Sequence, residues 1–196
     1  MSADLQRIHV KLLADAQPDL GLDPFLAIFG RWRQDKSHPS QWIDLADYAH
    51  MAKGPGILLV GKQGNFSANR DDPGLGLLYA GKAGFEGSEE ERVLEAFRRC
   101  LELTQAVLEE PEYPTGLKLE PGSWELFIND RLNFPNNEAT DAVLRSSIET
   151  ALNTLFGVGG YTLARDGDPQ RRYAFSIRAA TSGDLAELLD KVKTTA

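Results

Sequence analysis

One order of sequence patterns occurs twice in this 196-residue chain, and it limits the fold more than any single motif. Each half begins with an apolar strand pattern followed by an amphipathic helix. A pair of strand patterns joined by turn residues comes next, and a second amphipathic helix ends the half. A proline-rich segment, residues 112–122, separates residues 1–111 from residues 123–196 as a predicted linker. The repeated order indicates two similar halves packed as one compact unit.

Strands that are close together in a sequence favour antiparallel pairing, and the helices between them then cover one face of the sheet. We therefore predict an α+β fold with an antiparallel sheet or sheets and helices packed on one face. The two halves are expected to be ferredoxin-like and related by duplication. The sequence leaves open whether they share one sheet or form two.

The clearest predicted helix covers residues 88–108. Ser88 and Glu91 have the spacing of a capping box, and apolar residues follow at helical spacing as far as Leu108. Cys100 lies on the apolar stripe of this helix, so we expect its thiol to be buried. Further helices are predicted at residues 23–34 (with Asp23 as N-cap), 137–157 and 182–195. The residues of the 137–157 helix expected to face the core are Val143, Ile148, Ala151, Leu152 and Leu155.

Strand patterns lie between these helices, at residues 7–14, 56–60, 75–80, 124–130 and in a hairpin over 161–179. The stretch 61–74 is rich in turn-forming residues, so we expect a long loop there. Residues 40–50 fit a strand or a helix equally well. Trp42 and Trp124 stand at predicted strand starts, where they would line a cleft or a dimer contact.

The charge and the cysteine content narrow the choice of partners. A formal net charge of -8 at pH 7 and a sequence pI near 4.9 argue against nucleic acid or an anionic membrane as the main partner. One cysteine excludes an internal disulfide and is typical of a reducing compartment. The chain has no secretion-signal pattern and no run of about 18 apolar residues. We therefore expect a cytoplasmic protein.

Residues 56–62 nearly match a phosphate-binding loop, because Gly56, Gly61 and Lys62 have the spacing G-x-x-x-x-G-K. The four residues between the glycines are Ile, Leu, Leu and Val, which favour a strand rather than a cradle for phosphate. No helix is predicted after Lys62, and Gln63 lacks the hydroxyl group that would hold magnesium. The sequence therefore predicts no nucleotide site here and no cofactor.

Two groups of polar residues are the candidates for a functional site. Asp47 and His50 become neighbours if their segment forms a helix or a turn, and Asp47 would then orient His50 as a general acid or base. Lys62, Asn65 and Arg70 lie in the predicted loop, where Lys62 or Arg70 would hold an anionic substrate. The three histidines of the chain share no ligand spacing, so we expect no metal.

The run DYAHMAKGPGILLVG, residues 47–61, resembles a segment of an uncharacterised bacterial protein family of about this length. The resemblance implies no activity and assigns no site residue. Since the catalytic patterns fail, the main hypothesis is a self-associating, homodimeric module that binds a protein or small-molecule partner. The alternative is an enzyme with a site between residues 47–56 and the 61–74 loop.

Overall fold

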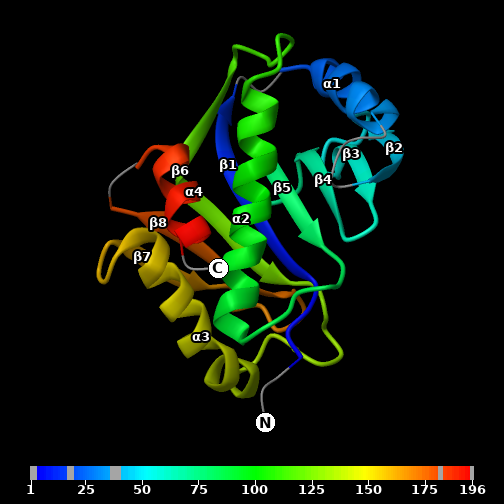
Figure 1. The fold of residues 1–196 in the computed structure, drawn as a ribbon. Coiled ribbons are helices and arrows are strands. Elements are labelled where there is room, and N and C mark those ends of the chain that lie inside the picture. Colours follow the sequence, from blue (N-terminus) through cyan, green and yellow to red (C-terminus); the bar gives the residue numbers. More distant parts are fainter. Residues whose placement is uncertain (1–3, 17–19, 36–40, 181–182, 195–196) are drawn as a thin grey trace.

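The computed structural model describes residues 4–16, 20–35, 41–180 and 183–194 of the chain (Figure 1). The helices are α1 (Asp23–Gln34), α2 (Glu89–Leu108), α3 (Glu138–Phe156) and α4 (Leu185–Thr194). The strands are β1 (Ile8–Ala16), β2 (Trp42–Tyr48), β3 (Gly56–Gly61), β4 (Gly64–Asn69), β5 (Gly76–Gly81), β6 (Leu117–Ile128), β7 (Tyr161–Arg165) and β8 (Tyr173–Ala179). No helix of the described ranges is long and apolar enough to cross a membrane.

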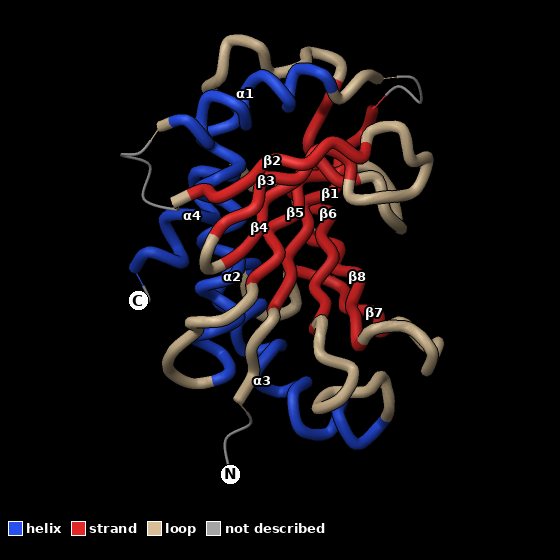
Figure 2. Tube along the Cα trace, turned by 90° about the vertical axis from the view of Figure 1, so that its right-hand side faces the viewer, coloured by secondary structure: helices blue, strands red, loops and turns tan. Residues whose placement is uncertain are grey.

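All eight strands form one antiparallel sheet in the order β2-β3-β4-β5-β1-β6-β8-β7. The helices lie on one side of the sheet, as Figure 2 shows edge-on. Helices α2, α3 and α4 pack against one another, whereas α1 packs on β2 and β3. The predicted α+β architecture is therefore confirmed, and the two halves share one sheet through the β1–β6 pair.

The core lies between the sheet and the helices. On β1, Ile8, Val10 and Leu12 are fully buried against α2, because alternate residues of a strand point to opposite faces. The capping box of Ser88 and Glu91 is present at the start of α2. The thiol of Cys100 is buried as expected, and burial raises its pKa to about 12.

Four details of the sequence interpretation are wrong. The expected 61–74 loop contains β4, whose Phe66 and Ala68 are fully buried in the core. Val143 on α3 is 57% exposed, so it does not face the core. The two tryptophans, expected to line a cleft or a dimer contact, are instead buried in the core. The N-cap of α1 is Leu22 rather than Asp23, which is the first helical residue.

The segment 112–122 contains more than a connection. Residues 117–122 belong to β6, and Leu117 and Leu119 pair with β1. Pro121 is tolerated in this strand at a place where the register between β1 and β6 shifts. The end of the predicted linker thus belongs to the strand that joins the two halves into one sheet.

The two halves repeat the same strand arrangement. In the first half β5 lies between β1 and β4, and in the second half β8 lies between β6 and β7. The loops that end these hairpins also have similar sequences, with Arg-Asp-Asp-Pro at 70–73 and Arg-Asp-Gly-Asp-Pro at 165–169. The first half adds the β2–β3 hairpin, which extends the sheet beyond β4.

Candidate functional site

A row of directly opposite residues crosses the whole sheet on the face that the helices leave uncovered. Each member is the register partner of the next, from β2 at one edge to β7 at the other. In order, they are Ala46, Leu58, Ser67, Leu78, Lys11, Glu125, Ser176 and Ala164. The row has two charged members, Lys11 and Glu125, and they stand next to each other where the two halves meet.

Lys11 is buried although it points away from the helices. It is 1% exposed, and its Nζ donates to Asn69 Oδ1 at 2.7 Å and to the Asp71 carbonyl at 2.8 Å. Gly76 leaves room for its stem, because a Cβ there would lie 3.1 Å from Lys11 Cε. Burial lowers the pKa of Lys11 to about 8, although the nearby Glu125 and Asp71 favour the charged form.

Glu125 is 9% exposed, and its Oε2 is buried with no hydrogen-bond partner among the residues that the structure describes. Its carboxylate forms no ion pair with Lys11, whose ammonium group donates to the β4–β5 loop instead. Burial raises the pKa of Glu125, and this effect outweighs the attraction of Lys11, Arg172 and Arg171. A buried carboxyl oxygen without a hydrogen-bond donor lowers the stability of the fold, so its presence indicates a role other than stabilisation.

A cavity of about 230 Å³ lies beside Glu125 on the uncovered face. Its walls come from β6, β7 and β8 and from the β4–β5 and β7–β8 loops. Six of the lining residues are Asp72, Pro73, Glu125, Asp166, Arg171 and Ser176. The cavity therefore lies where both halves of the chain contribute to its wall.

The 166–172 loop is held in place by its own polar contacts. Arg171 forms an ion pair of 3.2 Å with Asp166, whose Oδ1 also accepts the backbone N–H of Asp168. The side-chain amide of Asn136 donates to the carbonyls of Asp166 and Asp168. These contacts fix the loop beside the cavity before any ligand binds, which lowers the entropic cost of binding.

The row next to Lys11 and Glu125 is aromatic and basic. His9 packs on Phe127 with ring centroids 4.7 Å apart, and the Arg172 guanidinium lies 4.0 Å from the centroid of the Phe127 ring. Burial, together with the charge of Arg172, lowers the pKa of His9 to about 3. The imidazole is therefore neutral at physiological pH, and Arg172 forms a cation–π contact over Phe127.

The structure gives Asp47 and His50 no direct contact with each other among the described residues. Both are exposed at the β2–β3 turn, and Asp47 Oδ1 accepts the backbone N–H of Ala49 at 2.8 Å. Within the described residues, His50 makes no polar contact with Asp47. Their role in an enzyme stays a prediction.

The other three candidates are divided between the two ends of β3 and β4. Lys62 is exposed in the β3–β4 turn, and Asn65 lies near it on β4 with its Oδ1 buried and without a partner. Arg70 lies at the opposite end, where its backbone N–H donates to the Gly54 carbonyl at 3.1 Å and its guanidinium donates to the Leu20 carbonyl. The structure thus brings Arg70 toward the β2–β3 turn and leaves Lys62 and Asn65 far from it.

Sequence reasoning missed Lys11 and Glu125. Each interrupts an apolar strand pattern with a single charge, and such residues are typical of a solvated strand face. Lys11 and Glu125 could have been identified from their position in strands that are long and apolar enough to lie in the middle of a sheet. Their pairing, however, depends on contact between residues more than a hundred positions apart.

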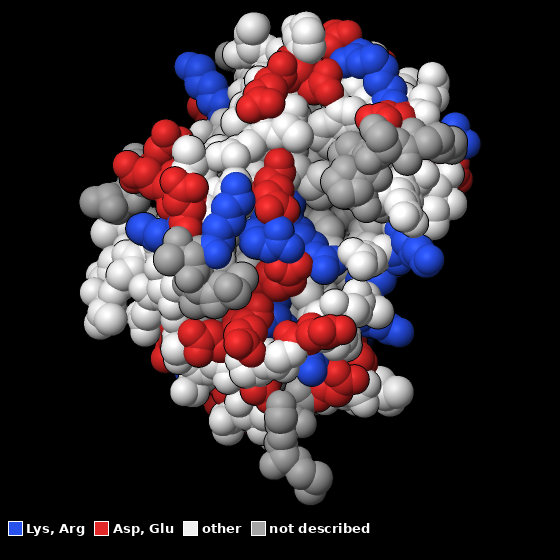
Figure 3. All heavy atoms as spheres, in the orientation of Figure 1, with Lys and Arg blue, Asp and Glu red and all other residues white. Residues whose placement is uncertain are grey.

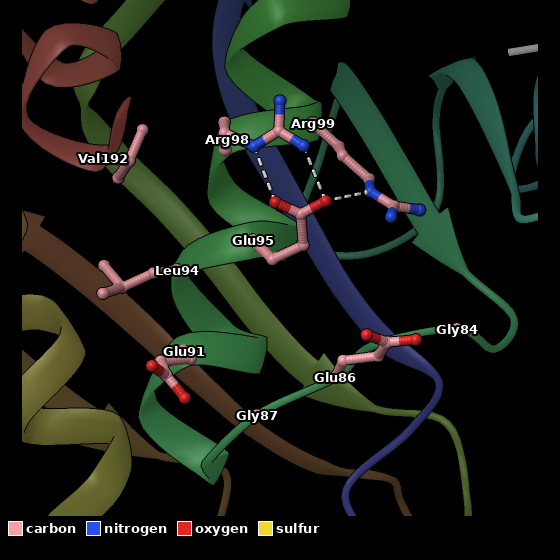
Figure 4. A pocket seen from close by; sticks show the side chains of 9 residues that line it. All are labelled: Gly84, Glu86, Gly87, Glu91, Leu94, Glu95, Arg98, Arg99 and Val192. Atoms are coloured by element: carbon pink, nitrogen blue, oxygen red, sulfur yellow. Dashed lines mark hydrogen bonds and ion pairs between the residues drawn. The ribbon is translucent and has the colours of Figure 1, made fainter. Parts of the chain in front are cut away.

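A second, larger cavity of about 460 Å³ lies on the helix side, between α2, α4 and the loop before α2 (Figure 4). The buried side of its charged lining is paired, because Glu95 accepts from both Arg98 and Arg99. Leu94 and Val192 form an apolar wall. We regard the smaller cavity as the better candidate because Glu125, whose Oε2 has no partner among the described residues, lines it.

The chain matches no protein-family model and no curated protein. In the described ranges, no group of three or more His, Cys, Asp or Glu side chains is arranged to hold a metal ion. The absence of a metal stays a prediction. A function must therefore be argued from the cavity and its residues.

Proposed function

We propose that this protein binds a small polar ligand in the cavity beside Glu125. The observation that carries the proposal concerns Glu125, which lines the cavity and whose buried Oε2 has no hydrogen-bond donor among the described residues. Because an unsatisfied buried polar atom costs about 1–3 kcal/mol, a ligand that donates to it gains affinity from the same atom. A concave site with a few convergent polar groups and a shifted pKa is typical of ligand binding.

The proposal does not include a reaction. Lys11, the other group with a strongly shifted pKa, has its Nζ held by Asn69 and Asp71 and does not line the cavity. His50 and Asp47 are exposed and separate from it. These positions support binding rather than acid–base catalysis.

The cavity can be filled from an exposed position to test the proposal. Ala164 is exposed and lines the cavity, whereas Thr162 is exposed on the same face of β7 and does not line it. We would titrate the ¹⁵N-labelled protein with small amines, alcohols, amides and carboxylates and follow amide chemical shifts. We expect shifts around Glu125 that Ala164→Phe abolishes and Thr162→Phe preserves. Shifts elsewhere, or shifts that Ala164→Phe leaves unchanged, would contradict the proposal.

We also propose that the protein forms a homodimer through β2, the edge strand of the first half. Two large apolar side chains of this strand are exposed, Ile43 at 59% and Tyr48 at 38%, which supports pairing with a second copy. Light scattering should give the dimer mass for the wild type and the monomer mass for Ile43→Lys. Val158→Lys, at an exposed apolar residue in the turn before β7, is the matched control. A wild-type monomer at micromolar concentration would exclude this dimer.

We further propose a duplicated, ferredoxin-like origin for the two halves, and membership of the uncharacterised bacterial family that residues 47–61 resemble. The repeated strand order and the similar loops at 70–73 and 165–169 support it. A cytoplasmic location is supported by the single, buried Cys100. On the face shown in Figure 3, basic side chains lie singly or in small groups next to acidic ones. That mixture and the net charge of -8 speak against nucleic acid as the partner.

A further inference from the structure

We infer that the ligand of the cavity is a small primary amine whose ammonium group donates to the carboxylate of Glu125. The inference rests on the proposed binding function and adds the chemical class of the ligand. The structural basis is a set of charged groups in which every nearby cation has another partner and the buried carboxylate does not.

Each guanidinium group of the lining forms an ion pair. Arg171 pairs with Asp166 at 3.2 Å. Arg165 pairs through Nη2 with Glu138 at the start of α3, while its Nη1 is buried without a hydrogen-bond partner among the described residues. Of the carboxylates that line the cavity, Glu125 is therefore left without a donor to its Oε2.

The cations close to Glu125 outside the lining are also engaged. Lys11 donates to Asn69 and to the carbonyl of Asp71. Arg172 lies over the Phe127 ring. The positive charges of Lys11 and Arg172 attract the carboxylate, but neither group donates a hydrogen bond to its Oε2. An ammonium ligand would donate that hydrogen bond, and the bond would be charge-assisted.

The rim and the walls fit the rest of such a ligand. Asp72 adds a second carboxylate whose partner, Lys53, is 75% exposed, so their 3.2 Å ion pair is readily exchanged for another cation. Pro73, Ala164 and Ala174 provide apolar surface for a short methylene chain. At about 230 Å³ the cavity is smaller than the pockets of drug-sized ligands, which limits the ligand to a few carbon atoms.

Three four-carbon probes of similar shape test whether the cavity prefers a positively charged, a neutral or a negatively charged ligand. We would measure binding by titration calorimetry with 1,4-diaminobutane, 1,4-butanediol and succinate. We expect the diamine to bind the wild type and the other two probes not to bind. Glu125→Gln should weaken diamine binding at least about tenfold, because it keeps the shape of the side chain and removes the charge that the ammonium group contacts. Glu86→Gln, in the other cavity, is the control and should bind like the wild type.

The outcomes distinguish the two proposals. If the diol or succinate binds and Ala164→Phe abolishes that binding, the cavity is a binding site and the amine inference is wrong. If the diamine binds equally well to the wild type and Glu125→Gln, the amine inference is also wrong. If no probe binds, the amine inference fails, and the chemical-shift titration separately decides whether the cavity binds other polar compounds. A cooperative thermal unfolding transition of Glu125→Gln, like that of the wild type, would show that the variant is folded.

Discussion

Lys11 and Glu125 are directly opposite each other on β1 and β6, and their charged groups nevertheless form no ion pair. The ammonium group of Lys11 turns toward the first half of the chain, where Asn69 at the end of β4 and Asp71 in the β4–β5 loop each accept a hydrogen bond from it. The carboxyl group of Glu125 lines a cavity that the second half helps to enclose. Two opposite charges that are buried side by side without pairing cost stability, and a binding site is a reason to retain them.

The buried ammonium group predicts a rise of stability with pH in the alkaline range. Burial lowers the pKa of Lys11 from 10.5 to about 8, so between these values the unfolded chain binds a proton that the folded protein lacks. The free energy of unfolding should therefore rise as the pH increases from 8 to 10.5, by up to about 3 kcal/mol. Urea unfolding of the wild type and Lys11→Met measures this, because the variant should lack that rise. Equal pH dependence in the two proteins would contradict the buried charge.

The buried carboxyl group of Glu125 predicts that, in the acidic range, stability falls as the pH rises. Burial raises the pKa of Glu125 above its ordinary value of 4.5, so the folded protein retains a proton that the unfolded chain has lost. The stabilisation is complete below pH 4.5 and is lost as the pH rises through the folded pKa. Relative to the wild type, Glu125→Gln should therefore become more stable as the pH increases from 4 to 7 in urea unfolding. A difference that stays constant over this range would show that the carboxyl group is not strained by burial.

His9 predicts a loss of stability in mild acid. Its pKa is lowered by burial from 6.5 to about 3, so below pH 6.5 the unfolded chain binds a proton that the folded protein does not. Between pH 6.5 and 5 this protonation should cost the wild type about 2 kcal/mol of unfolding free energy. His9→Leu places an apolar side chain against Phe127. Over the same pH range, its unfolding free energy should fall by about 2 kcal/mol less than that of the wild type. If both proteins lose the same free energy in urea unfolding, the imidazole is not held neutral by the fold.

The sequence was sufficient for the fold class because the helices and most strands have regular apolar spacing. Strand β4 was missed because Asn65, Ser67 and Asn69 resemble turn residues. Their side chains point to the uncovered face, and Ser67 and Asn69 are buried there by contacts with other strands. The site was missed for the same reason, because the environment of Lys11 and Glu125 depends on pairing across the whole chain.

The position of Lys11 also depends on a glycine, which gives a stability test with a close control. A Cβ at Gly76 would lie 2.3 Å from the Leu12 carbonyl oxygen and 3.1 Å from Lys11 Cε, and the backbone of the sheet cannot move away from it. Gly76→Ala should therefore lower the free energy of unfolding by about 1–3 kcal/mol and displace the Lys11 side chain. A Cβ at Gly167, in the β7–β8 loop, meets nothing within 4 Å, so Gly167→Ala should change stability by less than about 0.5 kcal/mol. Urea unfolding of both variants decides the matter. Equal stability would mean that β1 and β5 are not packed as closely at Gly76 as the structure has them, and the hydrogen bonds of Lys11 to the β4–β5 loop would lose their support.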